Sequence, residues 1–261
     1  NIIIDHCSMS WSNDEVFSVY GGDSTTLQWN LIAEPLNYSY HFEKGDKDFE
    51  KHGYGGIWGG AHLSAHHNLF ADCVSRNPRF NGARLGASDE LVDFRNNVIY
   101  NWEHNSSYGG EGGKYNMVNN YYRPGPQTNP NVKDRIVNPY KTKTLPYGKF
   151  YVQGNVVDGA PDVTKNNFLG IQMEKDATEQ DKLSTVANDP FLVLPIPEQS
   201  AAAAFSDVLS KVGASFRRDT MDLRILKEVV DKMFEISGHP LKFEDVAGRT
   251  DNWFQQYTMT D

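Results

Sequence analysis

Two arginines bracket an Asn-Pro pair in the segment Ser75-Arg76-Asn77-Pro78-Arg79-Phe80. Proline lacks a backbone donor and biases the preceding residue towards extended geometry, so the flanking side chains project from a fixed backbone. Guanidinium groups held in this way can grip carboxylates through two parallel hydrogen bonds. Taken alone, the segment indicates either a carboxylate-binding site or a surface loop whose arginines pair with local acids.

The composition limits the classes of partner. The chain has 261 residues, a formal net charge of -9 and a hydrophobic content of 39%, which is typical of a soluble globular protein with a sizeable core. Its acidic balance argues against nucleic acid as a partner, because phosphate binding needs a basic field. No run of residues is long and apolar enough to predict a membrane span.

The cysteines and the first residues carry less information. Cys7 and Cys73 are the only cysteines, and we expect both to be small buried apolar residues. The chain begins at Asn1, without Met, and its first residues already read as a strand. This predicts that residues are missing upstream, and an N-terminal fragment of the same precursor is a candidate partner.

A repeated pattern predicts the fold. Six times, a short alternating strand runs into a key position, five times Asn and once Cys, that apolar or aromatic residues follow: Cys7, Asn30, Asn68, Asn97, Asn120 and Asn155. The spacings of 23, 38, 29, 23 and 35 fit a base period of 23 residues with insertions. A period of this size predicts a parallel β-solenoid. The asparagines are expected to form an internal amide ladder at a bend where Asn tolerates left-handed geometry.

The pattern also divides the chain. Insertions at 33–60, 103–113 and 123–148 are expected to form loops on one side of the solenoid. The strand pattern stops near residue 160, which predicts a solenoid domain over 1–160 and an extension over 161–261 that packs on it. Residues 171–197 read as irregular, and two helices are expected, at 200–212 and from 219 or 220 to 236. The second should pack through an apolar face made of Met221, Ile225, Val229, Met233 and Ile236.

Several motifs together resemble the pectate lyases of polysaccharide lyase family 1. They are Asp5-His6 after a strand, the pair Asp14-Glu15, His67-Asn68-Leu69-Phe70, and the segment from Ser75 to Phe80. The tail is similar to that of bacterial secreted members. The resemblance implies an all-β, right-handed parallel β-helix that cleaves homogalacturonan, an acidic plant polysaccharide, by calcium-dependent β-elimination. It also implies a secreted, periplasmic or cell-surface bacterial enzyme.

The resemblance implies roles for individual residues. Arg76 matches the catalytic base, and calcium with cationic side chains would acidify the C5 proton of the uronate. Asp14 matches a Ca²⁺ ligand and Glu15 is a local substitute for a second one, since Ser18 stands where the family has an acid.

The same resemblance suggests substrate-binding residues. Lys51 and His52 are candidates for the family's substrate lysine. Arg79, the second arginine of the motif, is expected to bind substrate, as is Arg84, because the family's further arginine falls on Asn81. Asp5 and His6 are expected to be a buried hydrogen-bonded pair.

Two other functions remain open. A pectin lyase would act on methyl-esterified polymer without calcium, which the serine at position 18 favours. A non-catalytic β-helix that binds polysaccharide is favoured by the departures at Ser18 and Asn81.

Overall fold

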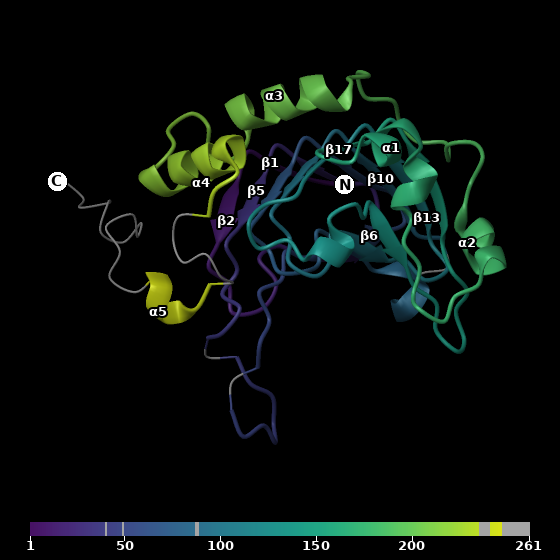
Figure 1. The fold of residues 1–261 in the computed structure, drawn as a ribbon, viewed down its shortest axis with the longest axis horizontal. Helices are drawn as coiled ribbons and strands as arrows, with labels where there is room; N and C mark the ends of the chain where they lie inside the picture. Colours follow the sequence, from purple (N-terminus) through teal and green to yellow (C-terminus); the bar gives the residue numbers. More distant parts are fainter. Residues whose placement is uncertain (40, 49, 87–88, 235–240, 247–261) are drawn as a thin grey trace.

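The chain folds into a parallel β-helix, as the repeat predicts (Figure 1). The computed structural model describes residues 1–39, 41–48, 50–86, 89–234 and 241–246. Three parallel sheets run along the solenoid, two of six strands and one of five. Each coil contributes one strand to the first sheet and one to the second, and the first five coils also contribute one to the third. Each strand pairs with the equivalent strand of the neighbouring coil.

The strand bounds follow the coils. The first sheet contains β1 (Ile2–Asp5), β4 (Thr25–Gln28), β7 (Leu63–His66), β10 (Leu91–Arg95), β13 (Lys114–Val118) and β16 (Lys149–Gln153). The second contains β2 (Ser8–Ser10), β5 (Leu31–Ala33), β8 (Leu69–Ala71), β11 (Val98–Tyr100), β14 (Tyr121–Arg123) and β17 (Val156–Val157). The third contains β3 (Val19–Gly22), β6 (Ile57–Gly60), β9 (Arg79–Phe80), β12 (Ser107–Gly109) and β15 (Val137–Pro139).

An asparagine ladder runs through the interior at the bend between the first and second sheets. The Oδ1 atom of Asn97 accepts from the backbone N and the Nδ2 of Asn68, both at 2.9 Å, and Asn97 Nδ2 donates to Asn120 Oδ1 at 3.1 Å. The ladder runs from Asn30 to Asn155 and continues to Asn167, which the repeat did not predict. It confirms the predicted role of these asparagines.

The left-handed bend falls one residue earlier than expected. The residue before each of the six repeat positions has a positive φ, from 51° at His6 to 70° at Gly154. The ladder residue itself is therefore free to point inward, where its amide satisfies the backbone of two coils.

Inside the coils, side chains stack in register. Leu27, Ala65, Phe94 and Met117 pair along the first sheet and are fully buried. Such stacking is what lets a coil bury its inner face, because only its neighbours can cover it.

Helices cover the outside of the solenoid (Figure 1). They are α1 (Pro161–Lys165), α2 (Glu179–Thr185), α3 (Ala201–Lys211), α4 (Thr220–Asp231) and α5 (Phe243–Val246), with 3-10 turns η1 (Gly82–Leu85), η2 (Pro130–Val132) and η3 (Asn167–Gly170). Within the part of the chain that the structure describes, no helix is long and apolar enough to cross a membrane.

Helices α3 and α4 follow the predicted caps. Ser200 and Asp219 accept from the backbone three residues on, as N-cap residues do. Val208, Ile225 and Val229 pack on Leu31 and its neighbours in the second sheet. The helix α2 lies inside 171–197, so the prediction of irregular structure there was wrong.

Some details differ from the sequence-based expectations. The second helix ends at Asp231, and Met233 is 39% exposed rather than part of the packing face. The expected last turn at Ile236 lies outside the described residues. Cys73 is buried but Cys7 is exposed. The Asp5–His6 pair is hydrogen-bonded at 2.5 Å as expected, but both side chains are 40% exposed rather than buried.

A buried charged cluster joins α4 to the solenoid. Arg224 donates to both carboxylate oxygens of Glu34, at 2.6 and 3.0 Å, and lies 3.2 Å from Glu228. Asp72 is 2% exposed, and Asn101 Nδ2 donates to one of its oxygens at 2.6 Å. Burial, together with the nearby Glu228 and Glu34, raises the pKa of Asp72 well above its ordinary value.

Removing one amide of the ladder should destabilise the fold. We expect Asn97→Ala to lower the free energy of unfolding by roughly 2–4 kcal/mol, because buried groups on both neighbouring coils lose their partners. Urea unfolding of Asn97→Ala against Asn188→Ala, which changes an exposed asparagine, measures the effect. Equal midpoints for the two variants would contradict the structural role of the ladder.

Asp72→Asn should stabilise the protein at neutral pH. A carboxyl with a raised folded-state pKa binds its proton more tightly in the folded state, so its stabilisation is lost as pH rises above the unfolded value of about 3.9. Asparagine avoids this loss, and we expect a gain of about 1 kcal/mol or more that grows with pH. Thermal unfolding at several pH values, with the exposed Asp189→Asn as control, measures it. A variant less stable than wild type at pH above 7 would contradict the assignment.

Candidate active site

The candidate site lies on the loops that join the second sheet to the third. In successive coils these loops carry Asp14 and Glu15, then the 33–56 insertion, then the segment around Arg76. Parallel bridges join Glu15 to Tyr54 and Tyr54 to Ser75, so three coils are held at one level. The coil register therefore brings Arg76 and its surroundings together from separate parts of the sequence.

Arg76 projects into an acidic and aromatic setting. Its Nη1 forms an ion pair with Glu15 Oε1 and lies 4.0 Å from Asp14 Oδ1. Its guanidinium carbon lies 3.9 Å from the centre of the Tyr54 ring, a cation–π contact. Burial raises the pKa of Tyr54, so the ring stays neutral beneath the guanidinium.

The backbone holds Arg76 in an uncommon conformation. Its φ is 60°, in the left-handed region that residues with a side chain seldom adopt. Gly56 N donates to the carbonyl of Arg76 at 2.8 Å, and Asn77 N donates to that of Ser106 at 3.0 Å. These bonds to the coils on either side fix the direction of the side chain, and such outliers cluster at functional sites.

Histidines and acids of the insertion lie beside Arg76. His52 Nε2 is 3.7 Å from Asp14 Oδ1 and 3.8 Å from Glu50 Oε2. The rings of His41 and His52 are 3.9 Å apart between centroids. The site thus combines one guanidinium, two imidazoles and at least three carboxylates.

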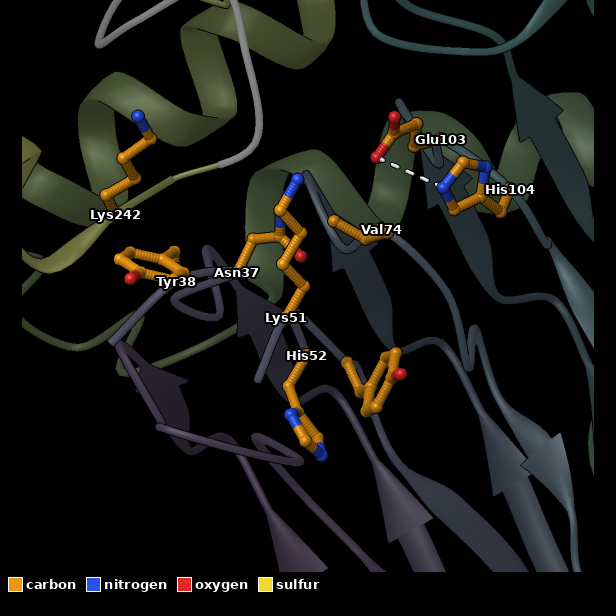
Figure 2. A pocket seen from close by; sticks show the side chains of 9 residues that line it. Asn37, Tyr38, Lys51, His52, Val74, Glu103, His104 and Lys242 are labelled. Carbon is orange, nitrogen blue, oxygen red and sulfur yellow. Dashed lines mark ion pairs between the residues drawn. The ribbon is translucent and has the colours of Figure 1, made fainter. Parts of the chain in front are cut away.

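A pocket of about 700 Å³ opens next to this cluster. Lys51, His52, Tyr54 and Lys242 line it together with Asn37, Tyr38, Val74, Glu103 and His104 (Figure 2). The structure therefore brings the predicted Lys51 and His52 to one cleft, adjacent to Arg76. Its two lysines suit an anionic ligand.

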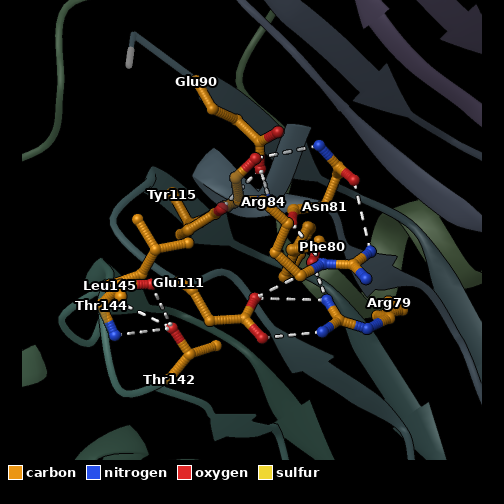
Figure 3. Close-up of polar contacts among 11 residues, drawn as sticks. Arg79, Phe80, Asn81, Arg84, Glu90, Glu111, Tyr115, Thr142, Thr144 and Leu145 are labelled. Carbon is orange, nitrogen blue, oxygen red and sulfur yellow. Dashed lines mark hydrogen bonds and ion pairs between the residues drawn. The ribbon is translucent and has the colours of Figure 1, made fainter. Parts of the chain in front are cut away.

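Arg79 lies in a different environment from Arg76. It is 9% exposed and pairs bidentately with Glu111, at 2.7 and 3.3 Å (Figure 3). Arg84 is bonded to Asn81 and lies 3.9 Å from Glu111, and its side chain is 33% exposed. Burial and the neighbouring Arg79 lower the pKa of Arg84. Substrate binding by Arg79 and Arg84 stays a prediction. Arg79 is the less available of the two for a substrate, because its guanidinium is already paired with Glu111.

The site fits a hard cation in part. Asp14 Oδ1 is buried and accepts no hydrogen bond from the described residues, while Asp14, Glu15 and Glu50 supply the oxygen donors that calcium prefers. Ser18, in contrast, accepts from Ile57 N at 3.0 Å, so its hydroxyl is used within the fold.

Several participants were missed in the sequence. Glu111 carried no signal as the partner of Arg79, because the two are 32 residues apart. The contact of His41 with His52 and the position of Tyr54 beneath Arg76 depend on the path of the insertion, which has no repeat to align it. The parallel bridges of Tyr54 could be located only once the coils were stacked.

The fold and site define a parallel β-helix with a charged cleft on its inter-sheet loops. Comparison of the sequence with known proteins identifies relatives. No protein-family profile matches the chain. It is 30% identical over 237 residues to a probable pectate lyase C of Aspergillus flavus, covering 88% of this chain and 48% of that protein. It is 31% identical over 235 residues to that of Aspergillus terreus, covering 87% and 48%.

A third relative is aligned over the whole chain. The probable pectate lyase C of Emericella nidulans is 30% identical over 267 aligned positions, covering 100% of this chain and 54% of that protein. The chain spans about half the length of the curated relatives it matches. These relatives are fungal, so they give no support to the bacterial type suggested by the tail.

Removing Glu111 should leave the buried Arg79 guanidinium without its charged partner. We expect Glu111→Ala to lower the free energy of unfolding by about 3–5 kcal/mol, because the Arg79 guanidinium loses its buried partner. The exposed Glu198→Ala serves as the control. In a double-mutant cycle, Arg79→Met combined with Glu111→Leu should cost less than the sum of the single changes. Additive costs would contradict a coupled pair.

Proposed function

We propose that this chain is the catalytic β-helix of a pectate lyase that cleaves de-esterified homogalacturonan by β-elimination. The observation that carries the proposal is that Arg76, from the Arg-Asn-Pro-Arg segment, contacts Asp14, Glu15 and the Tyr54 ring. Tyr54 in turn lines the pocket that also contains Lys51. The name of the relatives, probable pectate lyase C, supports the proposal. A secreted location follows from a plant polysaccharide substrate.

In the proposed reaction, Arg76 takes the C5 proton of a uronate. The electron pair of the C–H bond forms the C4–C5 double bond, and the C4–oxygen bond breaks with its electron pair on the oxygen. The neighbouring sugar is released when this oxygen takes a proton from water. Lys51 and His52 would hold uronate carboxylates at the cleft. Arg84 and Arg79 are weaker candidates for this role, since both contact Glu111.

Asp14 and Glu15 would hold calcium, with Glu50 within reach through its contact with His52. Bound calcium would neutralise the substrate carboxylate and so acidify the C5 proton. The ion pair with Glu15 occupies the Arg76 guanidinium. Arg76 must therefore separate from Glu15 before it can act as a base.

The proposal is tested with polygalacturonate and the ultraviolet absorbance of the unsaturated product. We expect Arg76→Ala to lower kcat by about 10²-fold or more, as for loss of a general base. Arg217→Ala changes an exposed arginine in the α3–α4 connection and should have no effect. A raised KM with unchanged kcat would instead make Arg76 a carboxylate clamp.

The same assay separates the alternative functions. Chelation by EDTA should abolish product formation and added calcium should restore it. Chelator-resistant release that prefers methylated pectin would select a pectin lyase, which the use of the Ser18 hydroxyl within the fold favours. Binding of polygalacturonate without any product would select a non-catalytic β-helix.

A further inference from the structure

Two histidines of the 33–56 insertion face an acid from the preceding coil. One ligand atom from each of Asp14, His41 and His52 lies within 4.8 Å of the other two. A second, overlapping group joins His41 to Glu43 and Glu50 by the same measure. His41 therefore belongs to both groups.

Two atoms of the first group lack partners. His52 Nδ1 and Asp14 Oδ1 are both buried, and neither forms a hydrogen bond with the described residues. Buried polar atoms are generally satisfied by protein, water or a ligand. Two orphaned atoms in one three-residue cluster point to a ligand that bridges them.

The donor types define the class of that ligand. Calcium takes oxygen ligands, whereas imidazole suits zinc, copper, nickel and iron. Two imidazoles with a carboxylate are a common set for divalent zinc, and Glu50 lies within reach of His52 as a fourth ligand.

We propose that His41, His52 and Asp14 bind a divalent transition metal of the zinc class beside Arg76. Zinc–ligand bonds of about 2.0–2.2 Å place tetrahedral ligands roughly 3.3 Å apart. The three ligand atoms lie within 4.8 Å of one another and would have to approach to this distance, and all three residues are partly exposed.

The site has a consequence for the proposed function, on which this step rests. Asp14 belongs both to this cluster and to the proposed calcium site, and it lies 4.0 Å from Arg76. If a transition metal bound to the histidines and to Asp14, then Asp14 would no longer be available as a calcium ligand. The bound metal would also place positive charge beside Arg76. Zinc is therefore an inhibitor that competes with calcium.

Metal binding is tested without reference to activity. The full chain, stripped of metal, is titrated with Zn²⁺ by calorimetry and with Co²⁺ by visible absorption, which reports coordination by imidazole nitrogen. We expect His41→Ala to weaken zinc binding by at least about tenfold. His62→Ala is the matched control, since His62 is exposed and pairs with Asp23 at the sheet edge. Equal zinc affinity in wild type and His41→Ala, or no binding by wild type, would overturn the site.

The competition is tested in the lyase assay. At limiting calcium, zinc should inhibit wild type and His62→Ala, and His41→Ala should keep its activity in zinc. Inhibition of His41→Ala equal to that of wild type would overturn the competition. If wild type releases no product at all, the proposed function fails, while the titrations still decide the metal site.

Discussion

The structure depends on the buried asparagine ladder. Each ladder amide forms hydrogen bonds with the backbone and with the amide of the next coil. Because the ladder is buried, losing either bond would leave a polar group without a partner, which destabilises the fold. The ladder therefore fixes how each coil is rotated against the next, whatever the length of the loops between them. Insertions of very different size leave the coils in register, and Glu15, Tyr54 and Ser75 stay at one level.

The two arginines of one short motif have separate environments. Arg79 lies in a strand of the third sheet, where its buried pair with Glu111 ties one coil to the next. Arg76 lies three residues earlier in a left-handed turn, and its side chain is 22% exposed and contacts Glu15 and the Tyr54 ring. The two arginines of the motif thus differ: one is in a buried pair between coils, and the other contacts a residue that lines the cleft.

The features that depend on the repeat and on local capping patterns could be predicted from the sequence. The parallel β-helix, the ladder from Asn30 to Asn155 and the capped helices α3 and α4 all follow from local patterns with a physical cause. The helix α2 was missed although Thr178 and Asp181 form a capping box, because its seven residues have little apolar periodicity. Contacts within the insertion, such as His41 with His52, depend on long-range packing and had no signal.

The cleft poses an electrostatic conflict. Asp14 and Glu15 contact Arg76, Glu50 contacts His52, and the whole chain carries a net charge of -9. Under the proposed function, a polyuronate that approaches this cleft meets carboxylates like its own. Lys51 and Lys242 offset only part of this repulsion from the pocket side. Arg76 is already paired with Glu15, so it adds little free positive charge. Under the proposed function, binding of an acidic polymer here therefore favours a divalent cation in the cleft, because its double charge attracts the carboxylates of the protein and those of the polymer.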